Sequence, residues 1–353
     1  MSASQALPSY HRSLRHIDGS SVGSFRLLLA IAVLISHSGY WFHGASQGVV
    51  AVVSFFVISG YVTTALIEKH YNDIAKTPAF LLDRVMRLFP QYLFYLVICI
   101  VLIWMGKGEI APWLSISPQA VAMNALMVPT NFYMLSDWVQ PMNPPTWTLG
   151  LEFTFYILAP ALILWRFRTT SFVLSFVVFL MAFYGVIDTD MYGYRLIAGT
   201  LFIFLCGSFM RTSATRTQRI LVGAAWIASW GLLGAIVLTS RFDAHYNIEM
   251  VVGLIIGIPA VALLSKVRYR RLDEVFGNIS YGVYLNHFPI QWALALCGLW
   301  TDGWPARILL IVLAFGVSWL TYTCIERPVI RARHRLRRQA QVEVLPVVDV
   351  EAS

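Results

Sequence analysis

The stretch Phe25–Phe42 reads FRLLLAIAVLISHSGYWF, which is as apolar as a membrane span yet carries Arg26 near one end and His37 toward the other. Ionisable side chains are costly inside a bilayer, so those found there are functional candidates by default. At about 100° per residue in a helix, the eleven positions between them bring both side chains to one face, roughly 16 Å apart along the axis. Two interpretations stay open here: an arginine anion clamp aimed at a titratable group, or a snorkelling arginine and a hydrogen-bonded core histidine.

Composition places the chain among membrane proteins. Hydrophobic residues make up 58% of its 353 residues and charged residues only 12%, whereas a soluble domain carries roughly 25% charged residues. The net charge of +8 comes from basic residues between apolar runs, as in loops of membrane proteins, so we expect no nucleic-acid partner. The four cysteines form no CxxC pair, which predicts neither a disulfide framework nor a metal site.

Apolar runs of the length of a membrane-spanning helix, roughly 17–25 residues, predict an all-α polytopic transmembrane bundle of about ten spans. The runs lie near residues 24–42, 48–68, 88–106, 146–165, 170–187, 194–211, 219–240, 248–265, 278–298 and 304–324. The stretch Pro118–Val128 is too short to span and is interpreted as interfacial or re-entrant. The first run is interpreted as a retained helix, because it is as long as a span and holds a histidine.

Lysine and arginine residues concentrate in alternate connections between these runs. The positive-inside rule then places both termini in the cytoplasm. The predicted organisation is a cytoplasmic segment 1–23, a transmembrane domain 24–326 and a basic, then acidic, cytoplasmic tail 327–353. In this orientation His37 and Glu152 each lie about 8–9 Å from the outer boundary, at 1.5 Å per residue. Since buried charges need partners, the two are candidate partners.

Six segments in order carry a family resemblance. They are FRLLLAIAVLISH with Arg26 and His37, GVVAVVSFFVISGYVTTAL, FLLDRVMRLFPQY with Arg84 and Arg87, PPTWTLGLEFTFYILAP with Trp147, Glu152 and Tyr156, FGNISYGVYLNHFPI with Tyr284 and His287, and ERPV at Glu326–Val329. Together they cover most of the chain and resemble the motifs of acyltransferase family 3, polytopic bacterial enzymes that O-acylate surface glycans. Thr148 stands where the family usually has serine, which keeps a hydroxyl group.

The resemblance implies acyl-CoA as the donor, acetyl-CoA in the simplest case, with a saccharide acceptor and the lipid bilayer as partners. His37 has the side chain of a general base near neutral pH, and Glu152 would orient it. Guanidinium groups suit phosphate oxygens, and three arginines would bind the donor: Arg26, Arg84 and Arg87. Four further residues are candidate substrate-binding residues: Trp147, Tyr156, Tyr284 and His287.

Each candidate also has a structural interpretation. Without the resemblance, Arg84 and Arg87 are better interpreted as positive-inside anchors, and Trp147 and Tyr156 as interface and packing residues. His287 fits a satisfied core histidine as well as a polar group in the acceptor path. Small residues on the second run are interpreted as close-packing positions: Gly48, Ser54, Ser59 and Gly60.

From these observations we expect a membrane O-acyltransferase of the bacterial inner membrane. It would move an acetyl or other short acyl group from cytoplasmic acyl-CoA to a sugar hydroxyl of a surface or lipid-linked glycan. The alternative is a proton-coupled transporter or flippase that uses a His37–Glu152 pair as a relay, although the two halves of the chain share no recurring motif. A membrane scaffold is a third interpretation, and it leaves the intramembrane Arg, His and Glu unexplained.

Overall fold

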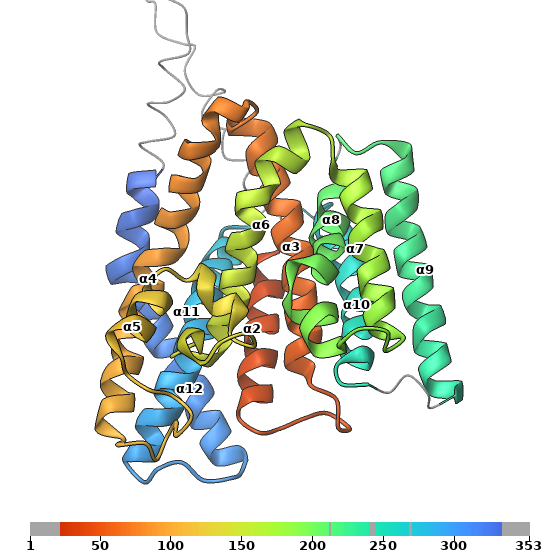
Figure 1. The fold of residues 1–353 in the computed structure, drawn as a ribbon. Helices are drawn as coiled ribbons and strands as arrows, with labels where there is room; N and C mark the ends of the chain where they lie inside the picture. The colour runs from red at the N-terminus through yellow and green to blue at the C-terminus, as the bar shows by residue number, and fades with distance from the viewer. Residues whose placement is uncertain (1–21, 212, 240–243, 268–269, 334–353) are drawn as a thin grey trace, which may run out of the picture.

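The computed structural model describes residues 22–211, 213–239, 244–267 and 270–333, which form a bundle of α-helices (Figure 1). The described residues contain no β-strand, only an isolated antiparallel bridge between Phe42 and Ala45. The prediction of an all-α helix bundle is therefore confirmed. Most of the predicted segment 1–23 and of the tail 327–353 lies outside the described residues.

Each predicted apolar run corresponds to one long helix. These are α2 (Gly23–His37), α3 (Gln47–His70), α4 (Thr77–Met105), α6 (Trp147–Leu164), α7 (Arg168–Phe183), α8 (Ile197–Phe209), α9 (Arg216–Thr239), α10 (Asn247–Leu264), α11 (Arg271–Leu296) and α12 (Trp304–Thr321). Seven helical stretches of the described chain are long and apolar enough to cross a membrane. Helices α2 and α7 are apolar but shorter, and α11 holds polar residues such as Asn286 and Gln291. The chain is a multi-pass membrane protein, while the ten spans and the cytoplasmic termini stay predictions.

The connections between helices alternate between two edges of the bundle. In Figure 1 the α3–α4 and α6–α7 connections lie at the upper edge, and the α2–α3 and α11–α12 connections lie at the lower edge. The two upper connections contain Lys76 and Arg166, whereas the two lower ones contain neither lysine nor arginine. The alternation on which the predicted orientation depends is thus present in the fold.

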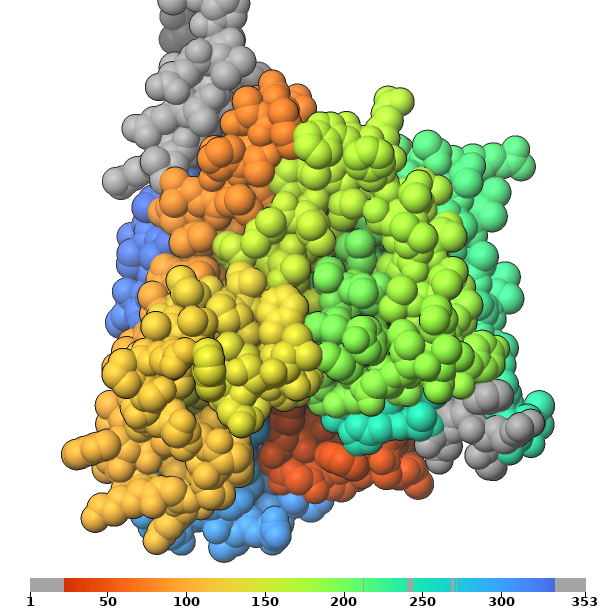
Figure 2. Space-filling model, viewed as in Figure 1, coloured from red at the N-terminus to blue at the C-terminus, as the bar shows by residue number. Residues whose placement is uncertain are grey.

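The segment between α4 and α6 folds back against the bundle. It contains short helices only: α5 (Pro118–Ala125), η3 (Val128–Phe132), η4 (Asp137–Val139) and η5 (Pro144–Thr146). Helix α5 has eight residues, so the stretch Pro118–Val128 is too short to span, as predicted. In Figure 2 this segment, in amber and yellow, lies on the lower left of the visible face. The amide of Asn143 donates to the carbonyl of Leu285, in the middle of α11, at 2.8 Å.

This folded segment changes where α6 begins. The sequence suggests that residue 146 lies at the outer boundary of the membrane, but Trp147, the first residue of α6, is buried, as is Thr146 before it. Helix α6 therefore starts inside the bundle, beside the middle of α11. Helix α2 also ends earlier than the predicted run, at His37 itself, because Gly39 turns the chain with a φ of +85°. Both differences bear on the predicted pairing of His37 with Glu152.

Helix α3 occupies the centre of the bundle and packs closely against α8. A Cβ on Gly60 would lie 1.7 Å from the carbonyl oxygen of Phe204, and one on Gly207 would lie 1.9 Å from that of Val57. Only glycine permits this approach of two helix backbones. The close-packing role expected for Gly60 is therefore confirmed, and α3 is held as a rigid wall beside the functional residues.

Helices α2 and α11 form the second close pair. The carboxylate of Asp273, in the first turn of α11, accepts hydrogen bonds from the backbone N–H groups of Gly23 and Ser24 at 2.8 and 2.7 Å. It also accepts one from the hydroxyl of Ser24 at 2.7 Å. These N–H groups at the start of α2 have no partner within their own helix. One carboxylate therefore fixes the start of α2 against α11, and the pairing continues along both helices.

Candidate active site

The predicted site residues line two cavities. The first, called here the arginine cavity, has a volume of about 120 Å³ and contains Arg26, Arg84, Arg87, Glu152 and Tyr156 in its wall. The second, the histidine cavity, has a volume of about 650 Å³ and contains His37, Trp147 and Arg195 in its wall. The structure thus brings the three predicted donor-binding arginines together, and it places His37 in a different cavity from Glu152.

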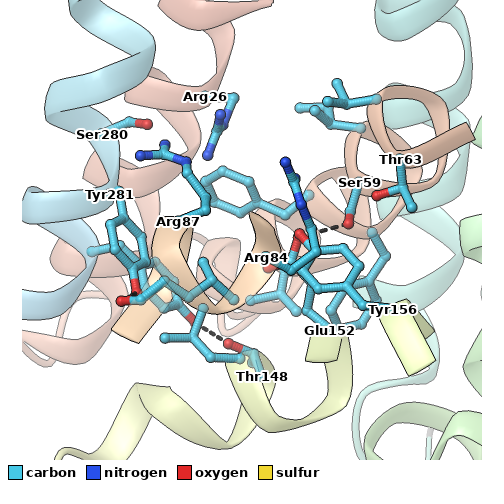
Figure 3. A pocket seen from close by; sticks show the side chains of 18 residues that line it. Arg26, Ser59, Thr63, Arg84, Arg87, Thr148, Glu152, Tyr156, Ser280 and Tyr281 are labelled. Atoms are coloured by element: carbon cyan, nitrogen blue, oxygen red, sulfur yellow. Dashed lines mark hydrogen bonds between the residues drawn. The ribbon is translucent and has the colours of Figure 1, made fainter. Parts of the chain in front are cut away.

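Two helices direct arginines into the arginine cavity. Arg26 comes from α2, and Arg84 and Arg87 come from α4, one turn apart on one face, as predicted. Figure 3 shows Arg26 and Arg87 side by side, with Arg84 across from them next to Glu152 and Tyr156 of α6. The wall carries three guanidinium groups and one carboxylate, so it favours an anionic ligand.

The three arginines differ in their partners. Arg84 is paired with Asp83, and its guanidinium lies 5.6 Å from the centre of the Tyr156 ring. Arg87 is paired with Glu326 of η7 (Tyr322–Glu326), and its guanidinium lies 5.5 Å from the ring of Tyr281. Arg26 has no carboxylate partner among the described residues. Within the described part of the chain, Arg26 is therefore the arginine of this cavity that no carboxylate pairs, and its guanidinium can bind an incoming anion.

Glu152 belongs to the polar lining of the arginine cavity. One of its oxygens, Oε1, accepts hydrogen bonds from the hydroxyls of Ser59 and Tyr156, both at 2.6 Å. The expected contact between Glu152 and His37 is not among the hydrogen bonds of the described residues. Glu152 does not lie at the depth of His37, because α6 starts inside the bundle, which moves Glu152 away from the lower edge. Ser59, interpreted from the sequence only as a close-packing residue, is a hydrogen-bond donor to this carboxylate.

His37 pairs instead with His287. Its Nδ1 lies 2.9 Å from Nε2 of His287, and the two rings are stacked with centroids 5.2 Å apart. His287 is fully buried, and its Nδ1 lies 3.2 Å from the carbonyl oxygen of Val283. His287 lines neither cavity, and it contacts two residues of the histidine cavity wall, His37 and Tyr284.

The hydrogen bonds of this pair assign its tautomers. A carbonyl oxygen can only accept, so Nδ1 of His287 carries a proton and Nε2 of the neutral ring is an acceptor. Nδ1 of His37 must then be the donor, which leaves Nε2 of the neutral His37 ring without a proton. His37 is exposed toward the histidine cavity, and its Nε2 makes no hydrogen bond among the described residues. His37 is thus prepared to accept a proton from a group in this cavity.

Aromatic rings dominate the rest of the histidine cavity. They belong to Trp41, Trp113, Tyr133, Trp147, Tyr194, Tyr246 and Tyr284. The lining includes no carboxylate. Burial raises the pKa of Tyr133 to about 12, so this phenol keeps its proton at neutral pH. His37 is therefore the group of this wall best suited to accept a proton.

Arg195 was not predicted as a site residue. Its guanidinium lies among four rings, with centroids 4.9 Å away for Trp147 and 5.2 Å for Tyr133, and it pairs with Asp190 at 2.8 Å. The sequence signal was an arginine at the very start of the apolar run 194–211, which is also consistent with a loop charge. The four rings and Asp190 fix its orientation at the cavity wall.

Three residues line both cavities and so form the wall between them: Val52, Thr148 and Tyr284. The hydroxyls of Thr148 and Tyr284 are hydrogen-bonded at 2.5 Å. Both also lie within hydrogen-bond distance of the carbonyl oxygen of Pro145, at 2.9 and 3.1 Å. The predicted substrate-binding residues are thus distributed: Tyr156 lies in one cavity, Trp147 in the other and Tyr284 between them.

The described residues contain no group of three or more His, Cys, Asp or Glu side chains that could hold a metal ion.

The helical bundle thus has a histidine pair at the wall of one cavity and three arginines in the wall of another. Comparison with known proteins identifies the class. A family model described as an acyltransferase domain matches residues 21–323, which is most of the chain. The protein belongs to acyltransferase family 3 and is a membrane acyltransferase, as predicted.

Individual relatives agree with this assignment. The chain is 25% identical to Nodulation protein 10 of Rhizobium leguminosarum bv. viciae, over 93% of this chain and 97% of the relative. It is 26% identical to the O-acetyltransferase OatA of Staphylococcus aureus (strain NCTC 8325 / PS 47), over 79% of this chain. It is 33% identical to an uncharacterized protein of Aquifex aeolicus (strain VF5), over 55% of this chain and 91% of the relative. The match to OatA spans only about half of that protein's length, 51%. No solved structure matches the chain.

Proposed function

We propose that this protein is an O-acyltransferase of the bacterial inner membrane with about ten spans and both termini in the cytoplasm. It moves an acetyl or other short acyl group from cytoplasmic acyl-CoA to a sugar hydroxyl of a surface or lipid-linked glycan. Family membership supports the acyl transfer. The observation that carries the mechanism is the His37–His287 pair, because its hydrogen bonds leave Nε2 of His37 free at a cavity wall.

The arginine cavity is the proposed donor site. Its three guanidinium groups suit the phosphates of coenzyme A, and Arg26 supplies a cation without a carboxylate partner among the described residues. The cavity of about 120 Å³ is small beside the 300–1,000 Å³ or so of typical ligand pockets. It therefore suits the narrow pantetheine arm better than the nucleotide. The helical distance from Arg26 to His37, roughly 16 Å, is comparable with the length of that arm.

His37 is the proposed general base. The acceptor hydroxyl gives its proton to Nε2 of His37 while its oxygen attacks the thioester carbonyl. The new C–O ester bond forms, the C–S bond breaks, and the coenzyme leaves as a thiolate that takes up the proton. His287 holds the His37 ring in the required tautomer and accepts its Nδ1–H. This is the orienting role that the sequence suggested for Glu152.

Glu152 has a proposed role at the donor. It balances part of the positive charge of the arginine cavity and fixes the hydroxyls of Ser59 and Tyr156. A carboxylate among three guanidinium groups keeps the cavity from binding anions so tightly that the product coenzyme cannot leave. Glu152 therefore acts on the donor rather than on the base.

The histidine cavity is the proposed acceptor site. Its volume of about 650 Å³ lies in the range of small-molecule sites. Aromatic rings offer apolar faces together with polar edges, which suits sugar rings with C–H faces and hydroxyl rims. Trp147 and Arg195 contact each other in this wall, with the guanidinium 4.9 Å from the centre of the indole ring. The relation to a protein named as an O-acetyltransferase supports transfer to a hydroxyl.

One assay tests this proposal against transport. Purified protein in lipid vesicles is given radiolabelled acetyl-CoA and glycan acceptors, and both free coenzyme and acylated glycan are measured. We expect one coenzyme released per acyl group transferred, and mass spectrometry of host glycans should show the loss of one acyl group when the gene is deleted. A protein that moves a solute and consumes no acyl-CoA would be a transporter. The proton relay of that alternative needs contact between His37 and Glu152, but the two residues line different cavities.

A further inference from the structure

We propose that Thr148 and Tyr284 form a gate between the two cavities. The gate admits the acyl end of the donor to the histidine cavity and keeps water away from the thioester at other times. This inference rests on the proposed function, because it concerns how a donor bound at the arginines meets a base in the other cavity. It assigns both residues a positioning role.

The two cavities meet only at one wall. Among the lining residues, Val52, Thr148 and Tyr284 alone are common to both. The hydroxyls of Thr148 and Tyr284 close this wall with a hydrogen bond of 2.5 Å. Figure 3 shows Thr148 at the end of the arginine cavity away from Arg26 and Arg84. An acyl chain that extends from the arginines therefore arrives at this hydroxyl pair.

The reaction requires passage through the wall. The guanidinium groups that suit the donor's phosphates line only the arginine cavity, while His37 lines only the histidine cavity. The thioester carbon must come within about 3–3.5 Å of the acceptor oxygen to react. The hydroxyl pair has to separate, or shift, for the acyl group to reach His37.

The hydroxyl pair is also linked to the base. Tyr284 lies one turn before His287 on α11, three residues away, so both side chains lie on neighbouring positions of one helix face. Thr148 lies in the first turn of α6, where the carbonyl of Pro145 accepts from either hydroxyl. The ring of Tyr284 packs edge-on against Phe55 of α3, with centroids 5.9 Å apart. Since Gly60 and Gly207 fix α3, movement of the gate occurs at α6 and α11.

An open wall would change the fate of the thioester. In the productive reaction the acceptor hydroxyl and the thioester give an ester and free coenzyme. When water is the nucleophile, water and the thioester give a free carboxylate, a proton and free coenzyme. His37 can assist that attack equally well. A hydrogen-bonded wall that separates at the right moment prevents this loss. The ratio of coenzyme released to acyl transferred therefore reports on the gate.

The test uses variants that remove the hydrogen bond and keep the shape, Tyr284→Phe and Thr148→Val, with Thr148→Ser as the variant that keeps the hydroxyl. The matched control is another buried tyrosine–threonine pair, Tyr95 and Thr321, whose hydroxyls lie 2.9 Å apart outside both cavities. Coenzyme release is measured with and without acceptor, together with acyl transfer. We expect Tyr284→Phe and Thr148→Val to raise acceptor-independent release about fivefold, the effect of one net hydrogen bond. Thr148→Ser, Tyr95→Phe and Thr321→Val should stay at the wild-type ratio.

Several results would overturn the gate. An unchanged ratio of coenzyme released to acyl transferred in both folded gate variants would show that Thr148 and Tyr284 only pack the wall. An equal rise in Tyr95→Phe and Thr321→Val would show a general loosening of the bundle. Loss of both transfer and hydrolysis in Tyr284→Phe would make Tyr284 a catalytic donor instead. A wild-type protein that consumes no acyl-CoA would contradict the proposed function itself, and this outcome is distinct from a coupled enzyme with an unaffected wall.

Discussion

The arginine cavity and the histidine cavity are built from different side chains. The first is narrow and carries three guanidinium groups. The second is about five times larger, and the described residues of its wall include seven Trp and Tyr side chains and no carboxylate. On the proposed function, the first suits a thin donor with an anionic head and the second a bulky uncharged acceptor. On that proposal, the charged groups that bind the donor and the group that accepts the proton lie in different cavities. This is so even though one helix, α2, supplies both Arg26 and His37.

The largest expected effect belongs to the histidine cavity. Because a positioned general base contributes about 10²–10⁴-fold, His37→Gln should reduce acyl transfer by that factor while the protein remains folded and inserted. Transfer by purified protein in vesicles measures the change, with size-exclusion chromatography as the check on folding. His43→Gln is the control, since His43 is exposed in the α2–α3 connection. Near-normal transfer by His37→Gln would remove the base from the mechanism.

The next effect distinguishes His287 from a substrate-binding residue. If His287 sets the tautomer of His37, His287→Ala should lower kcat roughly 10- to 100-fold, as loss of a partner that orients a functional histidine does, with little change in KM for the acceptor. The double variant with His37→Gln should be little worse than His37→Gln alone, because residues that act as a unit are non-additive. A raised acceptor KM with normal kcat would place His287 in the acceptor path instead.

Substitutions in the arginine cavity should change KM for acyl-CoA rather than kcat. Arg26→Ala should raise KM for acyl-CoA about tenfold, near the lower limit for a hydrogen bond to a charged group, and Arg26→Lys should restore only part of it because the planar fork is lost. Raising the salt concentration should reduce the difference in KM for acyl-CoA between the wild type and Arg26→Ala. An unchanged donor KM in Arg26→Ala would argue that the arginines only anchor the fold.

Arg87 makes the comparison sharper, because it has a carboxylate partner and Arg26 has none among the described residues. Removing Arg87 leaves Glu326, only 5% exposed, without its partner, and breaking a buried ion pair costs about 3–5 kcal/mol. Arg87→Ala should therefore lower the thermal unfolding temperature strongly, while Arg26→Ala should leave it almost unchanged. Equal destabilisation by both variants would mean that Arg26 also has a structural partner in the intact protein.

The smallest expected effect tests whether the cavities act independently. Glu152→Gln keeps an oxygen that can accept from Ser59 and Tyr156, so only its charge is lost, and we expect a decrease in transfer of about tenfold or less. Combined with His287→Ala, the two losses should multiply, since separated sites are additive in free energy within about 0.5 kcal/mol. A double variant with the same transfer rate as His287→Ala would show that Glu152 acts together with the histidine pair.

The sequence predicted the helices well because membrane spans are long apolar runs. Each of the ten runs became a helix, and the spacing of Arg84 and Arg87 correctly placed both on one face of α4. The pairing of His37 could not be predicted in the same way. Its partner depends on which helices touch, and the run of α2 contains nothing that specifies α11. The resemblance named both histidines without connecting them.

The predicted depth of Glu152 was wrong for a physical reason. The prediction places the start of each apolar run at the membrane boundary, whereas residues 106–146 fold against the bundle and bury Thr146. The hydrogen bond from Asn143 to Leu285 that holds this segment is a tertiary contact with no local signal. Arg195 was missed because three of the four rings around it, those of Tyr133, Trp147 and Tyr246, lie on other parts of the chain that only the fold brings together.

The contacts between α2 and α11 have a consequence for synthesis of the protein. Asp273 bonds Gly23, and His37 bonds His287, and each contact joins residues 250 positions apart in the chain. Because α2 is made long before α11, it must wait in the membrane until nearly the whole chain has been inserted before it meets its partner. On the proposed mechanism, the proton acceptor is therefore assembled among the last features of the fold. A chain interrupted before residue 287 would hold His37 without its orienting partner, so on that mechanism an incomplete product would not consume acyl donor in the membrane.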